Sequence, residues 1–202
     1  MAKRTLVVAS GNVGKLAEFE DMLGSRGYEV RPQSDFDVEQ PPETGKTFVE
    51  NALVKARTAA KASGHAALGD DSGLVVQALD GRPGIKSARY AGDDAGDDAN
   101  IDKLIGELEG LPEERRGAYF YCCLVLLRHA EDPAPLIATG RWHGHILESR
   151  RGDGGFGYDP IFHDRDMGAT AAELPAGEKN RVSHRGKALD ALMKLLDGLP
   201  GI

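Results

Sequence analysis

The sequence predicts an α/β fold built on a mixed β-sheet. Short apolar runs typical of buried strands alternate with segments whose apolar residues recur at helical spacing. The chain has 202 residues, of which 41% are hydrophobic and 28% charged, an ordinary composition for a folded protein. This length suits one large domain or two lobes that share a sheet, and we expect residues 1–202 to form a single domain of this kind.

The first segments alternate strand, helix and strand. Thr5–Ala9 is an apolar run that ends in Ser-Gly-Asn, which predicts a buried strand entering a turn. Tyr28–Arg31 predicts a second strand, followed by an acidic, proline-containing loop. The helix between them ends at Gly24 or Gly27, and its apolar residues are Leu16, Phe19, Met22 and Leu23.

A second helix is expected after the acidic loop. Thr47 and Glu50 have the spacing of a capping box, in which each residue satisfies a backbone N–H group of the other. Gly64 ends this helix. Two strands then follow, Ala66–Gly69 and Leu74–Leu79, with the Asp-Asp-Ser-Gly sequence of residues 70–73 as a turn between them.

From Arg82 onward, the sequence predicts a strand pair and two helices. Gly117–Arg128 is the strongest strand candidate, and Ile137–Ile146 is its expected antiparallel partner. Arg82–Gly92 is expected to be an ordered loop, and Arg150–Tyr158 is rich in glycine, as backbone that approaches a ligand often is. The helices are Asn100–Leu108 and a final one with the apolar residues Leu189, Leu192, Met193 and Leu196.

Composition excludes some functions. A net charge of −7 argues against sequence-blind nucleic-acid binding, which requires a basic face. No window approaches the length of a membrane span. Cys122 and Cys123 point to opposite faces if they lie on a strand, so we expect buried thiols without a disulfide. These features predict a cytoplasmic protein without membrane or nucleic-acid partners.

The segment Ser10-Gly-Asn-Val-Gly-Lys15 joins a predicted strand to a predicted helix. Its glycines allow close approach to a ligand, and N–H groups at the start of a helix attract anions. It is not a P-loop, because Leu16 follows the lysine where that motif has serine or threonine. Taken alone, this segment fits a plain strand–helix turn somewhat better than a phosphate-binding loop.

Adjacent carboxylates at Asp70 and Asp71 suggest a cation site. Mg²⁺ binds carboxylate oxygens and keeps positions open for substrate phosphates. If the backbone is extended there, one carboxylate faces a ligand and the other faces away. The acidic segment 35–43 offers a further ligand, although it reads equally as a solvated loop.

Two C-terminal segments suggest a nucleotide. Phe156, flanked by glycines, offers a surface on which a purine stacks, and Asp159 offers an acceptor for a ring N–H group. An anchor for a loop is the alternative role of this phenylalanine. Ser183 is a good N-cap for the last helix, which places His184 and Arg185 in its first turn, where cations oppose the helix dipole and favour an anionic or carbonyl-rich ligand.

Taken together, these segments resemble the inosine triphosphate pyrophosphatase family, which hydrolyses non-canonical purine nucleoside triphosphates. The matching segments lie in order along nearly the whole chain: 10–15, 43–55, 69–73, 83–92, 155–160 and 172–185. Ser10, where the family often has threonine, and Tyr158, where it varies between tryptophan and tyrosine, are small departures. The resemblance implies an elongated α/β fold with a long central mixed sheet, two lobes around a nucleotide cleft, and a homodimer.

The resemblance also implies roles for individual residues. Asp71 would be the catalytic base and a ligand of Mg²⁺, for which Mn²⁺ is a possible substitute. Glu39 is our first choice for the second metal carboxylate and Glu43 our second. The residues implied in binding the nucleotide are Ser10, Gly11, Asn12, Val13, Gly14, Lys15, Lys55, Ser72, Phe156, Gly157, Tyr158, Asp159, Lys179, His184 and Arg185.

The implied reaction is hydrolysis of ITP, dITP and XTP to the monophosphate and pyrophosphate, which removes these nucleotides before they enter DNA or RNA. Two alternatives remain open at this point. One is a pyrophosphatase for modified pyrimidine or dUTP-like nucleotides, and the other is a nucleotide-binding sensor without catalysis. Turnover of a panel of nucleotides distinguishes the first alternative from a purine pyrophosphatase. Nucleotide binding without turnover would identify the sensor.

Overall fold

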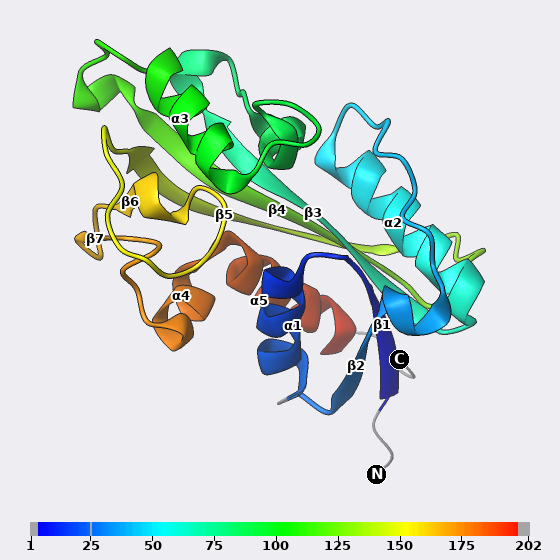
Figure 1. The fold of residues 1–202 in the computed structure, drawn as a ribbon. Helices are drawn as coiled ribbons and strands as arrows, with labels where there is room; N and C mark the ends of the chain where they lie inside the picture. The colour runs from blue at the N-terminus through cyan, green and yellow to red at the C-terminus, as the bar shows by residue number, and fades with distance from the viewer. Residues whose placement is uncertain (1–3, 25, 198–202) are drawn as a thin grey trace. The chain divides into compact units, whose positions relative to one another are not determined.

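The computed structural model describes residues 4–24 and 26–197. Its strands form one seven-stranded sheet in the order β2-β1-β3-β4-β5-β6-β7 (Figure 1). The strands are β1 (Arg4–Ala9), β2 (Tyr28–Pro32), β3 (Ala66–Val76), β4 (Gly117–Leu127), β5 (Leu136–Ile146), β6 (Phe162–Asp164) and β7 (Ala169–Thr170). The helices are α1 (Val13–Gly24), α2 (Phe48–Ser63), α3 (Asp97–Glu107), α4 (Ala176–Val182) and α5 (His184–Asp197).

The predicted α/β class and mixed sheet are confirmed. Strand β1 pairs in parallel with β2 and β3, whereas β6 pairs antiparallel with β5 and β7. The chain divides into two compact units. The first takes in the described residues up to Asp71, then 122–140 and the part of α5 from Arg185 onward, and the second comprises 72–121 and 141–184.

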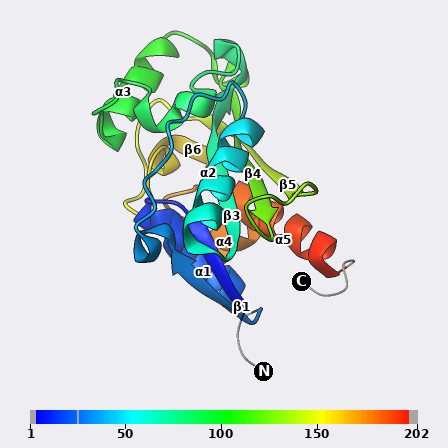
Figure 2. The same cartoon turned by 90° about the vertical axis from the view of Figure 1, so that its right-hand side faces the viewer.

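In the first unit, helices cover both faces of the parallel strands. Helices α1 and α5 lie side by side on one face, and α2 covers the other (Figures 1 and 2). Alternate residues of β1 explain this, because Leu6 and Val8 pack toward α1 and α5 while Val7 packs toward α2. Helix α2 approaches closely since its buried side chains against the sheet are small, namely Ala52, Ala56, Ala59 and Ala60.

The second unit has its own apolar core. Leu74 and Val76 of β3 pack in one cluster with Phe120 of β4 and Trp142 of β5. Ile101 and Leu104 of α3 cover this cluster, together with residues of the segment 158–162. Helix α3 and the segment that follows the glycine-rich residues 150–158 therefore pack against the same apolar core.

Several local predictions are confirmed. Thr47 and Glu50 form the capping box of α2, and Gly64 ends that helix with a left-handed backbone at φ 70°. Helix α1 ends at Gly24. Cys122 and Cys123 are buried thiols, as expected.

The predicted turn at residues 70–73 is wrong, because β3 runs through it without a break from Ala66 to Val76. Arg82–Gly92 is not only loop, since it contains a 3₁₀ helix at Gly84–Arg89. Helix α4 and the short strands β6 and β7 are additional elements. Within the described residues, no helix has the length and apolar character that crossing a bilayer requires.

Candidate active site

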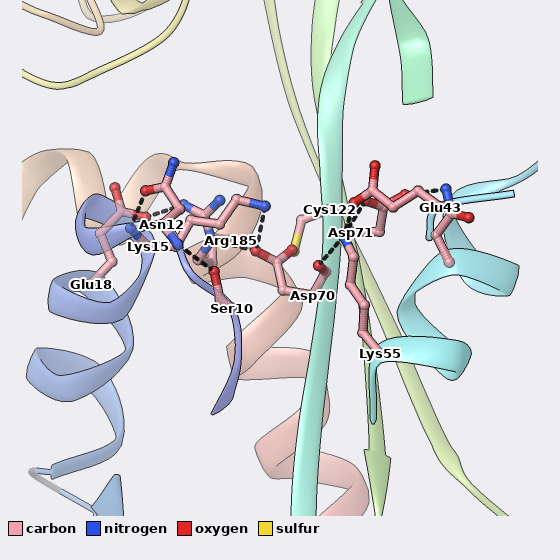
Figure 3. Close-up of polar contacts among 11 residues, drawn as sticks. Ser10, Asn12, Lys15, Glu18, Glu43, Lys55, Asp70, Asp71, Cys122 and Arg185 are labelled. Carbon is pink, nitrogen blue, oxygen red and sulfur yellow. Dashed lines mark hydrogen bonds and ion pairs between the residues drawn. The ribbon is translucent and has the colours of Figure 1, made fainter. Parts of the chain in front are cut away.

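Strand β3 presents two neighbouring carboxylates to its two sides. Asp70 and Asp71 lie in the extended part of the strand, and both are almost completely buried. Figure 3 shows Asp70 turned toward Lys15 and Arg185, and Asp71 turned toward Lys55. This is the geometry that an extended backbone gives to adjacent side chains.

On its side of the strand, Asp70 meets two cations and a thiol. Its Oδ2 lies 3.0 Å from the Lys15 ammonium and 3.4 Å from Nε of Arg185. The Cys122 thiol, on the neighbouring strand β4, donates to its Oδ1 at 3.4 Å. A carboxylate in such a buried position is stable because cations compensate its charge.

Arg185 is itself held from two directions. Its guanidinium contacts Asp70 and also pairs closely with Glu18 of α1. Although burial of Arg185 opposes its positive charge, these two carboxylates raise the pKa of the guanidinium above its usual value. Arg185 is therefore a fixed positive charge between α1 and β3.

The loop from Ser10 to Lys15 closes on its own backbone. The Asn12 N–H group donates to Oγ of Ser10 at 3.2 Å, and the Lys15 N–H group donates to Oδ1 of Asn12 at 3.0 Å. Asn12 thus caps α1, whose first two residues are Val13 and Gly14. Val13 is 79% exposed, and Gly11 is exposed beside it. The structure therefore places this loop at a helix start next to Asp70, as the sequence predicts.

On the other side of the strand, Asp71 faces helix α2. Its Oδ1 lies 2.9 Å from the Lys55 ammonium, and its Oδ2 accepts a hydrogen bond from Nδ2 of Asn51 at 3.1 Å. The same ammonium pairs closely with Glu43 and lies 3.4 Å from the Asp70 carbonyl. Asn51 and Lys55 share one face of the helix because they are four residues apart.

These contacts change how the groups titrate. Burial raises the pKa of Asp71, and nearby Glu43 adds to this, while Lys55 and Asn51 oppose it. Burial alone would lower the pKa of Lys55, but the carboxylates of Asp71 and Glu43 raise it. The result is a basic carboxylate beside a lysine that remains charged.

The two acidic-loop candidates occupy different environments. Glu43 is partly buried and pairs with Lys55, the cation that also contacts Asp71. Glu39 is exposed in the loop before α2. Proximity to Asp71 therefore favours Glu43, our second choice from the sequence.

The second unit groups another set of the predicted residues. Oδ2 of Asp159 accepts the Phe156 N–H at 2.9 Å and contacts the Lys179 ammonium at 2.7 Å. The same ammonium lies 4.9 Å from the centre of the Phe156 ring. Lys179 belongs to α4. Through this lysine, α4 holds the Asp159 carboxylate and places a positive charge near the Phe156 ring.

The remaining predicted residues lie in varied surroundings. Tyr158 is buried, and its hydroxyl donates to the Ser87 carbonyl at 2.9 Å. His184 stacks on Phe120, with ring centres 4.8 Å apart. Ser183 has an extended backbone immediately before α5, which suits an N-cap residue. Ser72 is half-buried and follows Asp71 on β3.

The sequence interpretation missed several residues of these clusters. Asn51 had a signal, since it lies one helical turn before Lys55 within a predicted helix. Glu18 had a weaker one, three residues after Lys15. Cys122 and Ser87 act through contacts from distant parts of the chain, for which local patterns give no signal.

Comparison with known proteins gives consistent matches. The sequence profile of the Ham1 family matches residues 6–195. The dITP/XTP pyrophosphatase of Vibrio vulnificus is 50% identical over 197 residues, which cover 98% of each chain. That of Halorhodospira halophila is 56% identical over 189 residues, covering 94% of this chain and 95% of the relative.

A solved structure agrees with these relatives. The HAM1 protein from Coxiella burnetii superposes with a TM-score of 0.89 at 47% identity, covering 97% of this chain and 100% of that one. A profile match over most of the chain and relatives at this identity lead to one conclusion. The chain belongs to the Ham1 family.

Proposed function

We propose that this protein hydrolyses non-canonical purine nucleoside triphosphates, namely dITP, XTP and ITP, to the monophosphate and pyrophosphate. Relatives that are 50% and 52% identical over nearly the full chain are dITP/XTP pyrophosphatases. The observation that carries the proposal is the pair of carboxylates on β3, each beside a lysine from a different helix. Such an arrangement suits a reaction that needs a base, a cation site and charges for a polyphosphate.

Asp71 is the proposed base. It is nearly buried, it is oriented by Asn51, and burial raises its pKa, so it accepts a proton more readily than an ordinary carboxylate. In this mechanism, Asp71 orients the attacking water and takes its proton. Lys55 keeps the carboxylate in place and stabilises charge on the phosphates.

The residues around Asp71 fit a magnesium ion. The carboxylates of Asp71 and Glu43 converge on the same ammonium, so both can offer oxygens to one cation. Within residues 4–24 and 26–197, no three His, Cys, Asp or Glu side chains cluster as metal ligands. A smaller set is enough for Mg²⁺, because this ion often binds through one or two carboxylates plus substrate phosphates. When bound, Mg²⁺ would offset phosphate charge and make pyrophosphate a better leaving group.

Lys15 and the start of α1 are proposed to hold the phosphates. Lys15 contacts Asp70 through a side chain that is 16% exposed, so the ammonium can turn to an incoming anion. The loop from Ser10 to Gly14 supplies backbone N–H groups at a helix start, which attract phosphate.

Phe156 and Asp159 are proposed to bind the purine ring of the nucleotide. A half-buried ring next to a fixed carboxylate can stack on a purine and accept from its ring N–H group. Hypoxanthine and xanthine carry a 6-oxo acceptor where adenine carries an amino donor. Hydrogen-bond donors that face the 6-oxo group would be left unpaired by ATP, and a mismatch of this kind can reduce kcat/KM by several powers of ten.

The nucleotide is the proposed partner, and Mn²⁺ is a proposed substitute for Mg²⁺. A homodimer and a cytoplasmic location remain predictions from the family resemblance and the composition. Sedimentation of the purified protein tests the first of these. A mass of twice 21.6 kDa is expected.

The function is tested by pyrophosphate release from ITP, XTP, dITP, GTP, ATP and dUTP, each measured with Mg²⁺ and with EDTA. We expect metal-dependent turnover of ITP, dITP and XTP far above that of ATP. Preference for dUTP would instead identify a pyrimidine pyrophosphatase. Tight ITP binding without turnover would identify a sensor.

A further inference from the structure

Three successive residues of the glycine-rich loop are each held by a different group. The Phe156 N–H donates to Asp159, three residues further along the chain. The Gly157 N–H donates to Oδ2 of Asp97 at 2.6 Å, and the Tyr158 hydroxyl donates to the Ser87 carbonyl at 2.9 Å. Two of the three anchors therefore lie far away in the sequence.

Asp97 is the first residue of helix α3, and it is exposed. The first two turns of the same helix also hold the other end of the loop, since Arg150 pairs with Asp98 at 3.3 Å and with Asp102 at 2.7 Å. The start of α3 thus holds the loop at both ends, at Arg150 and at Gly157. A carboxylate acceptor makes the contact to Gly157 a charge-assisted hydrogen bond.

The loop needs such an anchor because its backbone is permissive. Gly152, Gly155 and Gly157 all have positive φ values, of 80°, 77° and 60°. Glycines in this region leave a segment free to adopt several paths unless outside contacts select one. The Asp159 contact shapes the turn around Phe156, and Lys179 of α4 holds that carboxylate, whereas the amide of Gly157 on the other side of the ring is held by Asp97.

We propose that Asp97 is a positioning residue for the Phe156 ring. By holding the amide next to Phe156, Asp97 fixes the direction in which the ring leaves the loop and so presents a ready stacking surface. This inference rests on the proposed function, in which Phe156 stacks on the base. Asp97 acts through Phe156 and touches no reacting atom, so it should affect binding of the base and leave the chemical step alone.

The test compares D97A with D97N and D93A in ITP hydrolysis. D93A is the control because it removes the same charge four residues before Asp97. Asp93 is exposed, and within the described part of the chain its carboxylate has no hydrogen-bond partner. We expect D97A to raise KM for ITP and the inhibition constant of IMP by the same factor, roughly three- to tenfold, with kcat nearly unchanged. D97N should stay within about twofold of the wild type, because its amide oxygen still accepts the Gly157 N–H.

A double-mutant cycle with F156A separates positioning from a general structural effect. Without the ring there is nothing to position, so D97A should change KM by less than about twofold in the F156A background. A full additional loss in that background would overturn the proposal, as would equal KM values for D97A and D93A. Should D97A lower the melting temperature, the cycle still decides, because destabilisation affects both backgrounds alike. A wild-type protein without ITP turnover would instead refute the proposed function.

Discussion

Asp70 and Asp71 are adjacent in the chain, yet their carboxylates pair with lysines from different helices. Lys15 of α1 lies 3.0 Å from Asp70, and Lys55 of α2 lies 2.9 Å from Asp71. Asp70 is enclosed by groups that include Arg185 and Cys122, whereas Asp71 shares its lysine with the loop residue Glu43. The structure thus suggests an organising role for the first carboxylate and a chemical role for the second.

The substitution D71N should remove turnover and keep binding. The amide retains the shape and the contact with Lys55 but cannot take a proton at neutral pH. We expect kcat to fall by roughly 10²- to 10⁴-fold, with ITP affinity within a few-fold of the wild type. Turnover assays and calorimetric titration measure the two quantities. A D71N protein with half the wild-type kcat would place the base elsewhere.

The substitution D70N should lower stability. It removes the carboxylate charge that faces Lys15 and the buried guanidinium of Arg185, and the loss of one partner from a buried ion cluster costs about 3 kcal/mol or more. Urea denaturation gives the free energy of unfolding. The control is D35N, because Asp35 pairs with Arg31 at the surface, where such a pair contributes less than about 1 kcal/mol. Equal losses for the two variants would contradict the organising role.

The substitution E43Q should raise the Mg²⁺ concentration needed for half-maximal activity by at least about tenfold. Glu43 reaches the same ammonium as Asp71, so loss of its charge weakens a cation site at that point. E39Q is the matched control, since it makes the same chemical change in the same loop at an exposed position. Titration of activity with Mg²⁺ measures both. A larger effect of E39Q would restore our first choice from the sequence.

The substitution G69A should disrupt the contact between β3 and α2. A Cβ atom on Gly69 would lie 2.0 Å from the Ala52 carbonyl oxygen and 2.9 Å from the Ala56 nitrogen, and helix backbone cannot easily move aside. We expect the free energy of unfolding to fall by about 3 kcal/mol. G106A in α3 is the control, because a Cβ there meets nothing within 4 Å, and it should be neutral or stabilising. A G69A protein as stable as the wild type would show that α2 can shift.

Stability should depend on pH through His145. Burial lowers its pKa, and the positive charge of Arg165 and the neighbouring His163 lower it further, while Glu113 opposes them. The Nδ1 atom of His145 accepts from Nε of Arg165 at 3.3 Å, a bond that only the neutral ring can make. In the unfolded chain the pKa returns to about 6.5, so the unfolded state binds the proton first as the pH falls.

The contribution of His145 to the free energy of unfolding is therefore fully present above about pH 6.5. It is lost as the pH falls from there to the lower pKa of His145 in the folded state. Melting temperatures of the wild type and of H145Q between pH 8 and pH 5 test this. The wild type should lose more than the variant over that range. Parallel curves would show that His145 does not contribute.

Much of the first unit could be predicted because its signals are local. The capping box at Thr47, the end of α2 at Gly64 and the alternation of strands and helices depend on residues that are close in sequence. The opposite directions of Asp70 and Asp71 also followed from an extended backbone. Local signals failed where distant partners decide the structure.

The error at residues 70–73 has that cause. Asp-Asp-Ser-Gly has the composition of a turn, but here Lys15 and Lys55 compensate both carboxylates and allow them inside a strand. The sequence could not distinguish Glu39 from Glu43 as the metal ligand for a similar reason. Only the position of Lys55 distinguishes the two carboxylates, and the loop sequence does not contain it.

The charges around β3 have a consequence for the form in which a nucleotide enters. Three cations and four carboxylates form ion pairs there in two groups: Lys15, Arg185, Glu18 and Asp70 on one side, and Lys55, Glu43 and Asp71 on the other. Each cation already has an internal counterion, so a free triphosphate would bring about four more negative charges to a cluster that carries no surplus of positive charge. A triphosphate that arrives as its magnesium complex brings part of the compensation with it. We therefore expect the rate to follow the concentration of the complex rather than that of total nucleotide, and excess free nucleotide to compete poorly.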